Sequence, residues 1–366
     1  MKLNEEKNIY KLICSVIKKK SAELHEPHFN HLEIKYLNQA IKKKSVSRKG
    51  NFVYRFSKKI KLLTKSNNVI LTSSGTSALH LALVALNIKE NEEILMPSLN
   101  YIASANATLY CGAIPHFVDV DEESLGIDPI KLKKYLEKIC IIKNKKCINK
   151  KTKRPIKALI CLHTFGYPAK ILELQKICFT YHIKLIEDSA EALGSFFNKK
   201  HLGTFGDIGI LSFNGNKTIT CGSGGAILTN SKKIEKKARH LISTAKIGHP
   251  FNYIHDEIGY NYRMPNLNAA LGYSQILKIK KILKNKRKLF SFYKKIFNKN
   301  LFFKLLNEPK ESKSNFWLQT IILKKKYSNF NQKIIKDLIK EKIHVRPGWK
   351  LMTDLNYLKK SPKMDI

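Results

Sequence analysis

The stretch "LSFNGNKTITCGSGGAILTN", residues 211–230, places one lysine, Lys217, between an apolar run and a glycine cluster. Neither common phosphate-binding loop matches it. A Walker A loop needs Gly-Lys-Ser/Thr after a four-residue spacer, whereas Asn216 separates the preceding glycine from Lys217. A dinucleotide fingerprint needs a glycine where "GSGGAI" has Ile227, and a strand rather than a helix is expected next. Lys217 therefore follows a strand, with Ser212 five residues earlier, and its role depends on residues elsewhere in the chain.

The region upstream of this stretch alternates short β-branched runs with helical stretches. The expected strands are residues 67–74, 92–97, 114–121, 156–163 and 183–189, and the expected helices are 77–88, 98–112 and 169–182. Such alternation predicts an α/β fold with a mostly parallel central sheet flanked by helices. Ligands of such sheets bind beyond the carboxyl ends of the strands.

The region downstream has a different texture. Residues 231–243 and 266–297 read as long Lys-rich helices, and residues 314–323, 331–342 and 343–348 read as strand, helix and strand. We expect two domains, an N-terminal segment plus large domain over residues 1–245 and a smaller α+β C-terminal domain over residues 246–366.

The charge balance is strongly basic, with 68 Lys and Arg against 28 Asp and Glu, a formal net charge of +40. The lysines are spread along the whole chain and accompany many Ile and Asn residues, which share A/T-rich codons. This pattern favours compositional drift over a selected nucleic-acid surface, so we expect no specific nucleic-acid partner. Such a surface still attracts anions, including phosphorylated substrates, in a salt-dependent way.

The seven cysteines form no CxxC pair, and several lie in apolar runs. Buried free thiols are typical of a reducing compartment. No apolar stretch is long enough for a signal peptide at the start or a membrane span later. We expect a soluble, cytoplasmic protein with no membrane partner.

Two strand ends carry residues suited to an anion and a cation. Gly75, Thr76 and Ser77 open a helix after the strand at 67–74, where an anion such as phosphate binds well. A plain helix cap explains them equally well. Asp188 ends a nearly apolar strand, and its carboxylate needs a partner: a pyridinium nitrogen, a backbone amide or a lysine.

The chain order joins these features: a helix start that cradles phosphate, a later acid, a serine, and then Lys217. Pyridoxal 5'-phosphate needs this set, because it requires a phosphate anchor, a counter-charge for its ring nitrogen and an amine for its aldehyde. A partly buried lysine is the residue type that forms a Schiff base with an aldehyde. Without the other features Lys217 would read as a solvated lysine.

At this point the sequence resembles the sugar aminotransferases of the DegT/DnrJ/EryC1/StrS family, from about Leu24 to Leu351. The segments that carry the resemblance are "SSGTSALHLAL", "NATLYCGAIPHFVDVD", "IEDSAEALGS", "LGTFGDIGILSFNGNK" and "GSGGAILTN". The resemblance implies a fold-type I PLP-dependent transferase, with pyridoxal 5'-phosphate as cofactor and no metal.

The resemblance also implies a role for each matching residue. Lys217 would bond to the cofactor aldehyde, and Asp188 would pair with the pyridinium nitrogen. The remaining cofactor contacts would be Gly75, Thr76 and Ser212 at the phosphate, Tyr101 stacked on the ring, Glu191 beside the cofactor, and Asn261 at the phosphate of a neighbouring subunit. The last contact implies a homodimer with shared active sites. His163 ends a strand beside the site, and we expect it to be structural or to support a neighbouring site residue. Arg263 is expected to make either an anion contact or a structural ion pair.

Further segments narrow the substrate. "HTFGYPAK", "SFNGNKTIT", "HDEIGYNYRMPNLNAALGYSQ", "SNFWL" and "RPGWKL" look most like enzymes that aminate C4 of UDP-4-keto-6-deoxy-N-acetylglucosamine with glutamate. The alternatives are a GDP- or dTDP-linked keto sugar, or an eroded, non-catalytic basic paralogue. Sugar dehydratases of this family carry histidine in place of Lys217.

Two departures from the family pattern stand out. Asn30 replaces a usual glycine and is expected to alter the turn there. The family also continues past the point where this chain stops at "SPKMDI", so we expect a shortened small domain with weaker stability or substrate closure.

Overall fold

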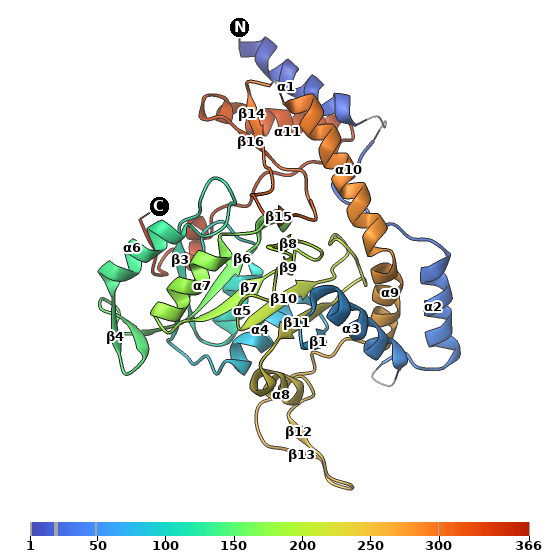
Figure 1. Cartoon of the computed structure of the whole chain (residues 1–366), viewed down its shortest axis with the longest axis vertical. Helices are drawn as coiled ribbons and strands as arrows, with labels where there is room; N and C mark the ends of the chain where they lie inside the picture. Colours follow the sequence, from blue (N-terminus) through green and yellow to red (C-terminus); the bar gives the residue numbers. More distant parts are fainter. Residues whose placement is uncertain (1, 18–20, 48–49, 299, 366) are drawn as a thin grey trace.

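The computed structural model describes residues 2–17, 21–47, 50–298 and 300–365 (Figure 1). Its main sheet has the strand order β1-β11-β10-β7-β6-β2-β3. These strands are β1 (Asn68–Thr72), β2 (Glu93–Pro97), β3 (Ile114–Val118), β6 (Pro155–Leu162), β7 (Lys184–Asp188), β10 (Ile208–Ser212) and β11 (Gly225–Thr229). Strands β10, β7, β6, β2 and β3 run parallel to one another, whereas β11 is antiparallel to both β1 and β10. The mostly parallel α/β sheet predicted from the alternating pattern is confirmed.

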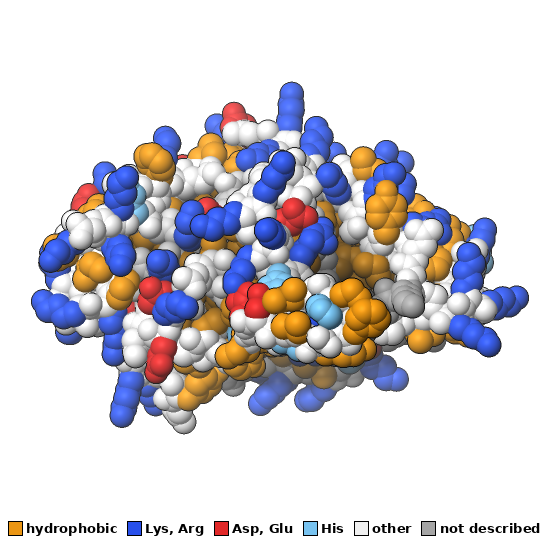
Figure 2. All heavy atoms as spheres, turned by 90° about the horizontal axis from the view of Figure 1, so that it is seen from below, with side chains coloured by type: hydrophobic (Ala, Val, Ile, Leu, Met, Phe, Trp, Pro, Cys, Tyr) orange, Lys and Arg blue, Asp and Glu red, His pale blue; other side chains and the backbone are white. Residues whose placement is uncertain are grey.

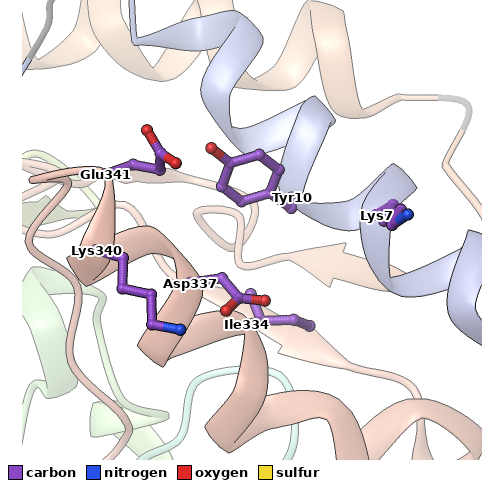
Figure 3. A pocket seen from close by; sticks show the side chains of 6 residues that line it. All are labelled: Lys7, Tyr10, Ile334, Asp337, Lys340 and Glu341. Carbon is purple, nitrogen blue, oxygen red and sulfur yellow. The ribbon is translucent and has the colours of Figure 1, made fainter.

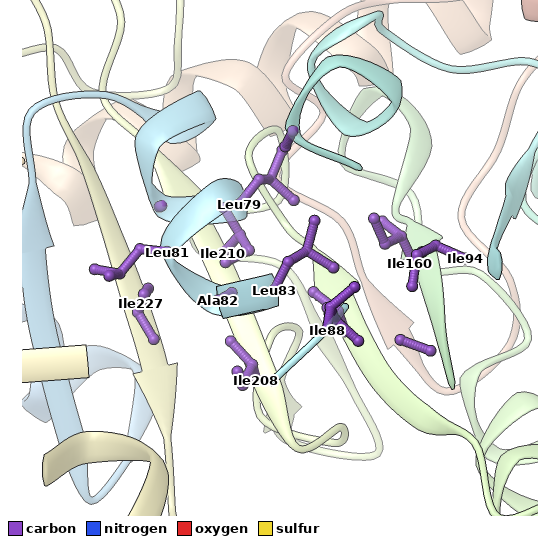
Figure 4. Close-up of a cluster of buried hydrophobic side chains, with 14 of the residues drawn as sticks. Leu79, Leu81, Ala82, Leu83, Ile88, Ile94, Ile160, Ile208, Ile210 and Ile227 are labelled. Carbon is purple, nitrogen blue, oxygen red and sulfur yellow. The ribbon is translucent and has the colours of Figure 1, made fainter. Parts of the chain in front are cut away.

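One face of the sheet is covered by α4 (Gly75–Ala85), α5 (Ala103–Tyr110) and α8 (Lys232–Leu241). Side chains on a strand alternate between faces, so every second apolar residue points to these helices. Figure 4 shows Leu79, Leu81 and Leu83 of α4 against the isoleucines of β2, β6, β10 and β11, and these side chains are buried. This cluster fixes α4, and hence its first residue, against the sheet.

The other face is covered by two groups of helices. Helices α2 (His31–Lys42), α3 (Asn51–Thr64) and α9 (Asn266–Leu277) pack near β1, β11 and β10. Helices α6 (Pro129–Ile139) and α7 (Ile171–Thr180) pack over β7, β6, β2 and β3. The sheet is thus the middle of three layers, as expected for parallel strands that are buried on both faces.

A second, smaller apolar cluster joins elements from both ends of the chain. It contains α1 (Lys2–Val16), α10 (Ile279–Phe297), β14 (Phe303–Leu305), β16 (Ile321–Leu323) and α11 (Asn331–Lys340). Figure 1 shows this unit above the main sheet, with the long α10 leading to it from α9. The predicted helix over residues 266–297 is therefore two helices, of which α9 packs on α2 and α3.

The last part of the chain returns to the main sheet. The Met352 N–H donates to the Ser98 carbonyl at 2.9 Å, and the Met364 N–H donates to the Phe117 carbonyl at 2.9 Å. The division of the chain at residue 245 stays a prediction.

Two strands predicted for the small domain are wrong in whole or in part. Residues 343–348 form no strand, since Ile343 makes only an isolated bridge with Ala22, and Pro347 cannot donate to a sheet. Residues 314–323 are extended only at the end, as β16, because Asn315 uses its side chain to bond loops of the large domain.

The remaining elements are short. They are β4 (Cys140–Lys143), β5 (Lys146–Asn149), β8 (Phe196–Phe197), β9 (Lys200–His201), β12 (Lys246–Ile247), β13 (Ile254–His255) and β15 (Ser312–Lys313), with short 3₁₀ helices at Thr164–Gly166, Lys325–Phe330, Met352–Asp354 and Asn356–Leu358. Strands β12 and β13 form a hairpin that projects from the molecule (Figure 1).

The turn at Asn30 is an ordinary helix start. Its backbone is extended, with φ of −150°, its side chain accepts from the Leu32 N–H, and its own N–H donates to Glu33. An asparagine therefore serves as the cap of α2 without left-handed backbone strain.

The basic side chains do not gather into one stripe on the face seen in Figure 2, where lysines and arginines are spread among acidic and apolar side chains. Within the described ranges, no helix has both the length and the apolar character that crossing a membrane requires.

Candidate active site

Lys217 lies in the loop between β10 and β11, which folds back on itself. The Phe213 N–H donates to the Gly224 carbonyl at 2.8 Å, and the Lys217 N–H donates to the Asn214 carbonyl at 3.0 Å. The Lys217 side chain is only 14% exposed, and its Nζ lies 3.1 Å from Glu191 Oε1. The same Nζ is 4.1 Å from the centre of the Trp317 ring. Lys217 is therefore held between an acid and an aromatic ring rather than in solvent.

Asp188 is the last residue of β7 and is buried. The Ser104 hydroxyl donates to Oδ2 at 3.1 Å, and the Ala190 N–H donates to Oδ1 at 3.2 Å. Burial raises the pKa of Asp188, while the field of Lys217 and these two hydrogen bonds act to lower it. An ionised carboxylate has about four acceptor sites. This carboxyl group therefore has room for a further cationic or N–H donor.

The start of α4 makes a cradle beside β10. Gly75 is the first residue of the helix, after the capping residue Ser74. A Cβ at Gly75 would lie 3.0 Å from Ser212 Cβ and 3.1 Å from Ser212 Oγ. The first N–H groups of a helix have no acceptor within it. The helix start at Gly75 and Thr76 thus lies with its first residue against Ser212, so free backbone N–H groups are close to a hydroxyl, which suits a phosphate.

Gly225, at the end of the loop that carries Lys217 (the lysine loop), allows the chain to lie close to the start of α4. A Cβ there would lie 2.4 Å from the Ser74 carbonyl oxygen. Only glycine lets β11 approach the helix start so closely.

Glu191 is buried and anchors the loop after β6. Its Oε2 accepts from the Phe165 N–H at 2.8 Å, while Oε1 faces Lys217. Burial raises the pKa of Glu191 and the charge of Lys217 acts to lower it. The sequence prediction placed Glu191 beside the cofactor, and the structure places it beside Lys217.

Aromatic side chains line the same region. Tyr101 is 57% exposed, and its ring centre lies 6.4 Å from that of Trp349. The ring centre of Phe165 is 4.9 Å from Trp349 and 6.5 Å from Trp317. Stacking of Tyr101 on a cofactor stays a prediction. Trp317, Trp349 and Phe165 were not predicted as site residues, although all three stand in segments that resemble the family.

Asn261 is exposed and lies on a segment beside the start of α4. It forms a β-bridge with Ser243, and the next residue, Tyr262, accepts at its carbonyl from the Ser73 N–H at 2.7 Å. Arg263 forms a backbone bridge with Thr72. Since a single chain is described, the reach of Asn261 into a neighbouring subunit stays a prediction.

His163 has partners that explain it structurally. It is fully buried, its Nδ1 accepts from the Ala169 N–H at 3.2 Å, and Nε2 then donates to Glu187 at 3.0 Å. Both ring nitrogens are used within the protein.

A surface pocket elsewhere does not belong to this site. It lies between α1 and the end of α11, and the side chains that line it are Lys7, Tyr10, Ile334, Asp337, Lys340 and Glu341 (Figure 3). None of them contacts Lys217, and its cations and acids are balanced.

The residues at Lys217 fit pyridoxal 5'-phosphate. The space left by the missing Cβ of Gly75, above Ser212 Oγ, suits the phosphate. The buried Asp188 carboxyl suits a ring N–H, and Lys217 supplies a shielded amine. These residues therefore match the phosphate, the ring nitrogen and the aldehyde of the cofactor.

Comparison with known proteins gives the same assignment. The family model of the DegT/DnrJ/EryC1/StrS aminotransferases matches residues 27–364. The chain is 36% identical to GDP-perosamine synthase of Escherichia coli O157:H7, over 82% of this chain and 77% of that protein. It is 32% identical to UDP-4-amino-4,6-dideoxy-N-acetyl-beta-L-altrosamine transaminase of Campylobacter jejuni, over 79% of this chain and 73% of that protein.

A solved structure shows the same fold. GDP-4-keto-6-deoxymannose-3-dehydratase with a trapped PLP–glutamate geminal diamine aligns with a TM-score of 0.83 at 22% identity, over 94% of this chain and 90% of that chain. The family match and the donor set together identify the cofactor as pyridoxal 5'-phosphate and the activity as nucleotide-sugar transamination. The chain belongs to the DegT/DnrJ/EryC1/StrS aminotransferase family.

Proposed function

We propose that this enzyme transfers the amino group of glutamate to C4 of a nucleotide-linked 4-keto-6-deoxy sugar. The observation that carries the proposal is the position of Lys217 Nζ, shielded from solvent 3.1 Å from Glu191 and 4.1 Å from the Trp317 ring. Bound pyridoxal 5'-phosphate supplies an electron sink for the charge that develops at Cα of the amino donor. The residues of the chain supply binding, orientation and proton transfer.

Lys217 Nζ is the group that we assign to proton transfer. A base must lie within hydrogen-bonding reach of the proton that it removes, and a shielded amine at the site meets this need. It would take the proton from Cα of glutamate and return one to the sugar at C4 in the second half of the reaction. Glu191 Oε1 orients this amine, and the Trp317 indole excludes water from one side of it.

Asp188 and the α4 cradle are assigned to binding. The buried Asp188 carboxyl would hold the proton on the ring nitrogen, because a cation beside it offsets the cost of its burial. Gly75, Thr76 and Ser212 would bind the phosphate at the helix start.

The sequence segments and the overall identity to relatives favour different nucleotides in the substrate. Sequence segments favoured UDP-4-keto-6-deoxy-N-acetylglucosamine, whereas the identity to GDP-perosamine synthase is higher and extends over more of this chain. We give first place to a GDP-linked sugar and second place to the UDP-N-acetyl sugar.

Kinetics with a panel of nucleotide-linked keto sugars test whether the GDP-linked sugar is preferred. We expect measurable amination of a GDP-linked 4-keto-6-deoxy sugar with glutamate, and a kcat/KM at least about tenfold lower for UDP- and dTDP-linked sugars, since each 1.4 kcal/mol of discrimination is a factor of ten. NMR of the products would locate the new amine at C4. Preference for the UDP-N-acetyl sugar would instead agree with the substrate expected from the sequence segments. Amination at C3 would contradict the proposed position of the new amine.

We also propose a homodimer that shares its active sites. The projecting β12–β13 hairpin and the residues after it carry apolar side chains in solvent: Phe251 is 89% exposed, Tyr253 82% and Ile258 80%. Exposed apolar groups of this kind are typical of surfaces that pack on a partner. Asn261 follows directly on this segment, which supports its predicted contact with a neighbouring subunit.

A further inference from the structure

Lys286 is a shielded cation that the proposed reaction has not used. It lies on α10, and its Nζ donates to the Trp317 carbonyl at 3.0 Å. Burial lowers the pKa of Lys286 to about 8. The neighbouring Arg287 pairs with Glu308 at 2.8 Å, but no carboxylate of the described chain pairs with Lys286. An ammonium group has three donors, so two remain available for a ligand.

His25 adds a second unsatisfied group. Its Nδ1 is buried and has no hydrogen-bond partner within the described ranges. Burial lowers the pKa of His25 to about 3, and the charges of Lys286 and Lys217 act in the same direction. The imidazole is therefore neutral at ordinary pH, and it lies within the field of both lysines.

Two hydrogen bonds to His28 explain where the segment that contains His25 lies. The carbonyl of His28 accepts from Gln275 Nε2 at 3.0 Å and from Lys278 Nζ at 2.8 Å. These bonds fix the segment that contains His25 along the junction of α9 and α10. Lys286 lies on the same helix about two turns further along.

Trp317 joins Lys286 to the catalytic lysine. Its carbonyl accepts from Lys286, its ring lies against Lys217 Nζ at 4.1 Å, and its Nε1 donates to the Asn216 carbonyl at 2.7 Å. One residue thus contacts both lysines and is held in place by the lysine loop. Lys286 is therefore linked through Trp317 to the reacting amine, and the charges of Lys286 and Lys217 both act on His25.

We propose that Lys286 and His25 form a subsite for an anionic oxygen group of a substrate. Shielding a cation without a counter-charge costs free energy, and a bound anion offsets that cost. The ammonium supplies charge-assisted hydrogen bonds, and the neutral imidazole supplies one N–H donor. The choice of sources rests on the proposed function: the anion is the diphosphate of the nucleotide sugar or a carboxylate of glutamate.

Steady-state kinetics of the PLP-loaded enzyme test the subsite and identify the source. For Lys286→Met we expect the KM of one substrate to rise about tenfold or more, as for loss of a charge-assisted hydrogen bond, with kcat within about threefold of the original. Lys286→Arg should recover part of the loss. His25→Gln should raise the KM of the same substrate by a smaller factor. A higher KM for glutamate assigns the carboxylate, and a higher KM for the sugar assigns the diphosphate.

Lys284→Met is the matched control, because Lys284 is on the same helix but exposed. It removes the same charge from a chain of net charge +40, so it accounts for non-specific attraction of anions. Both lysine variants are compared at about 0.15 M salt, where long-range attraction is screened.

Binding measurements keep the test independent of turnover. Sodium pyrophosphate and glutarate are titrated into the PLP-loaded protein, with tryptophan fluorescence as the readout. We expect at least one of them to bind about tenfold more weakly to Lys286→Met than to Lys284→Met. If no sugar is aminated but this difference holds, the proposed function fails and the subsite stands. If the two variants bind both probes equally and show the same KM values, the subsite is overturned. If the methionine variant does not fold, His25→Gln takes its place, and equal binding and equal KM values for His25→Gln and Lys284→Met then overturn the subsite.

Discussion

Replacing Lys217 with alanine should lower kcat by about 10³-fold or more. The change removes both the amine that bonds to the cofactor and the group assigned to proton transfer, and proton transfer alone contributes about 10²–10⁴-fold. The measurement is the rate of 2-oxoglutarate release from glutamate in the presence of a keto sugar. The same variant should lose the visible absorbance of lysine-bound cofactor and retain cofactor only by its non-covalent contacts.

Lys200→Ala is a suitable control for this change. Lys200 also lies over an aromatic ring, with Nζ 4.5 Å from the centre of Phe205, but it is exposed and lies on β9. It should leave both rate and absorbance unchanged. Activity of Lys217→Ala within about tenfold of the original enzyme would remove Lys217 from the mechanism.

Replacing Asp188 with asparagine should give the second largest loss. The amide keeps the shape of the side chain and can still accept from Ser104, but it removes the negative charge that faces the ring nitrogen. Loss of one preorganised electrostatic contact of this kind costs about 10²–10³-fold in kcat. The measurement is kcat with saturating glutamate and added cofactor, so that weaker cofactor binding does not enter the rate.

The fold should survive the Asp188 change, because a neutral amide is easier to bury than a carboxylate whose pKa burial has raised. A melting temperature close to that of the original protein would show this. Asp119→Asn is the control at the same sheet edge, since Asp119 follows β3 and pairs with Lys131. If Asp188→Asn kept nearly full activity, the pairing with the ring nitrogen would be wrong.

The main sheet could be predicted because each strand is a short apolar run between helical stretches. For example, the strand predicted over residues 183–189 is only one residue longer than β7 at each end. The small domain was harder, because its segments are short and its apolar cluster joins α1 to α10 and α11 across most of the chain. Residues 314–323 are apolar enough for a strand, but Asn315 Nδ2 donates to the Glu191 and Leu193 carbonyls and keeps most of the segment in a loop.

At the site, sequence order alone led to Lys217, Asp188 and the α4 start. The structure adds that Lys217 lies beside Glu191 and that Gly75 lies beside Ser212. Their roles toward the cofactor remain predictions.

The contacts of Trp317, Lys286 and His25 could not be predicted from spacing. They come from distant parts of the chain, and a lysine or histidine in so basic a sequence carries no signal of its own. Only tertiary packing, which shields Lys286 beside the Trp317 carbonyl, singles it out.

The most direct test of transamination at Lys217 uses glutamate without any sugar. The PLP-loaded protein should release 2-oxoglutarate in an amount equal to its active sites and then stop, while the absorbance of lysine-bound cofactor is lost. A keto sugar added afterwards should restore that absorbance, as a two-stage reaction requires. Full cofactor loading with no 2-oxoglutarate, and no change in absorbance on adding glutamate, would contradict the account.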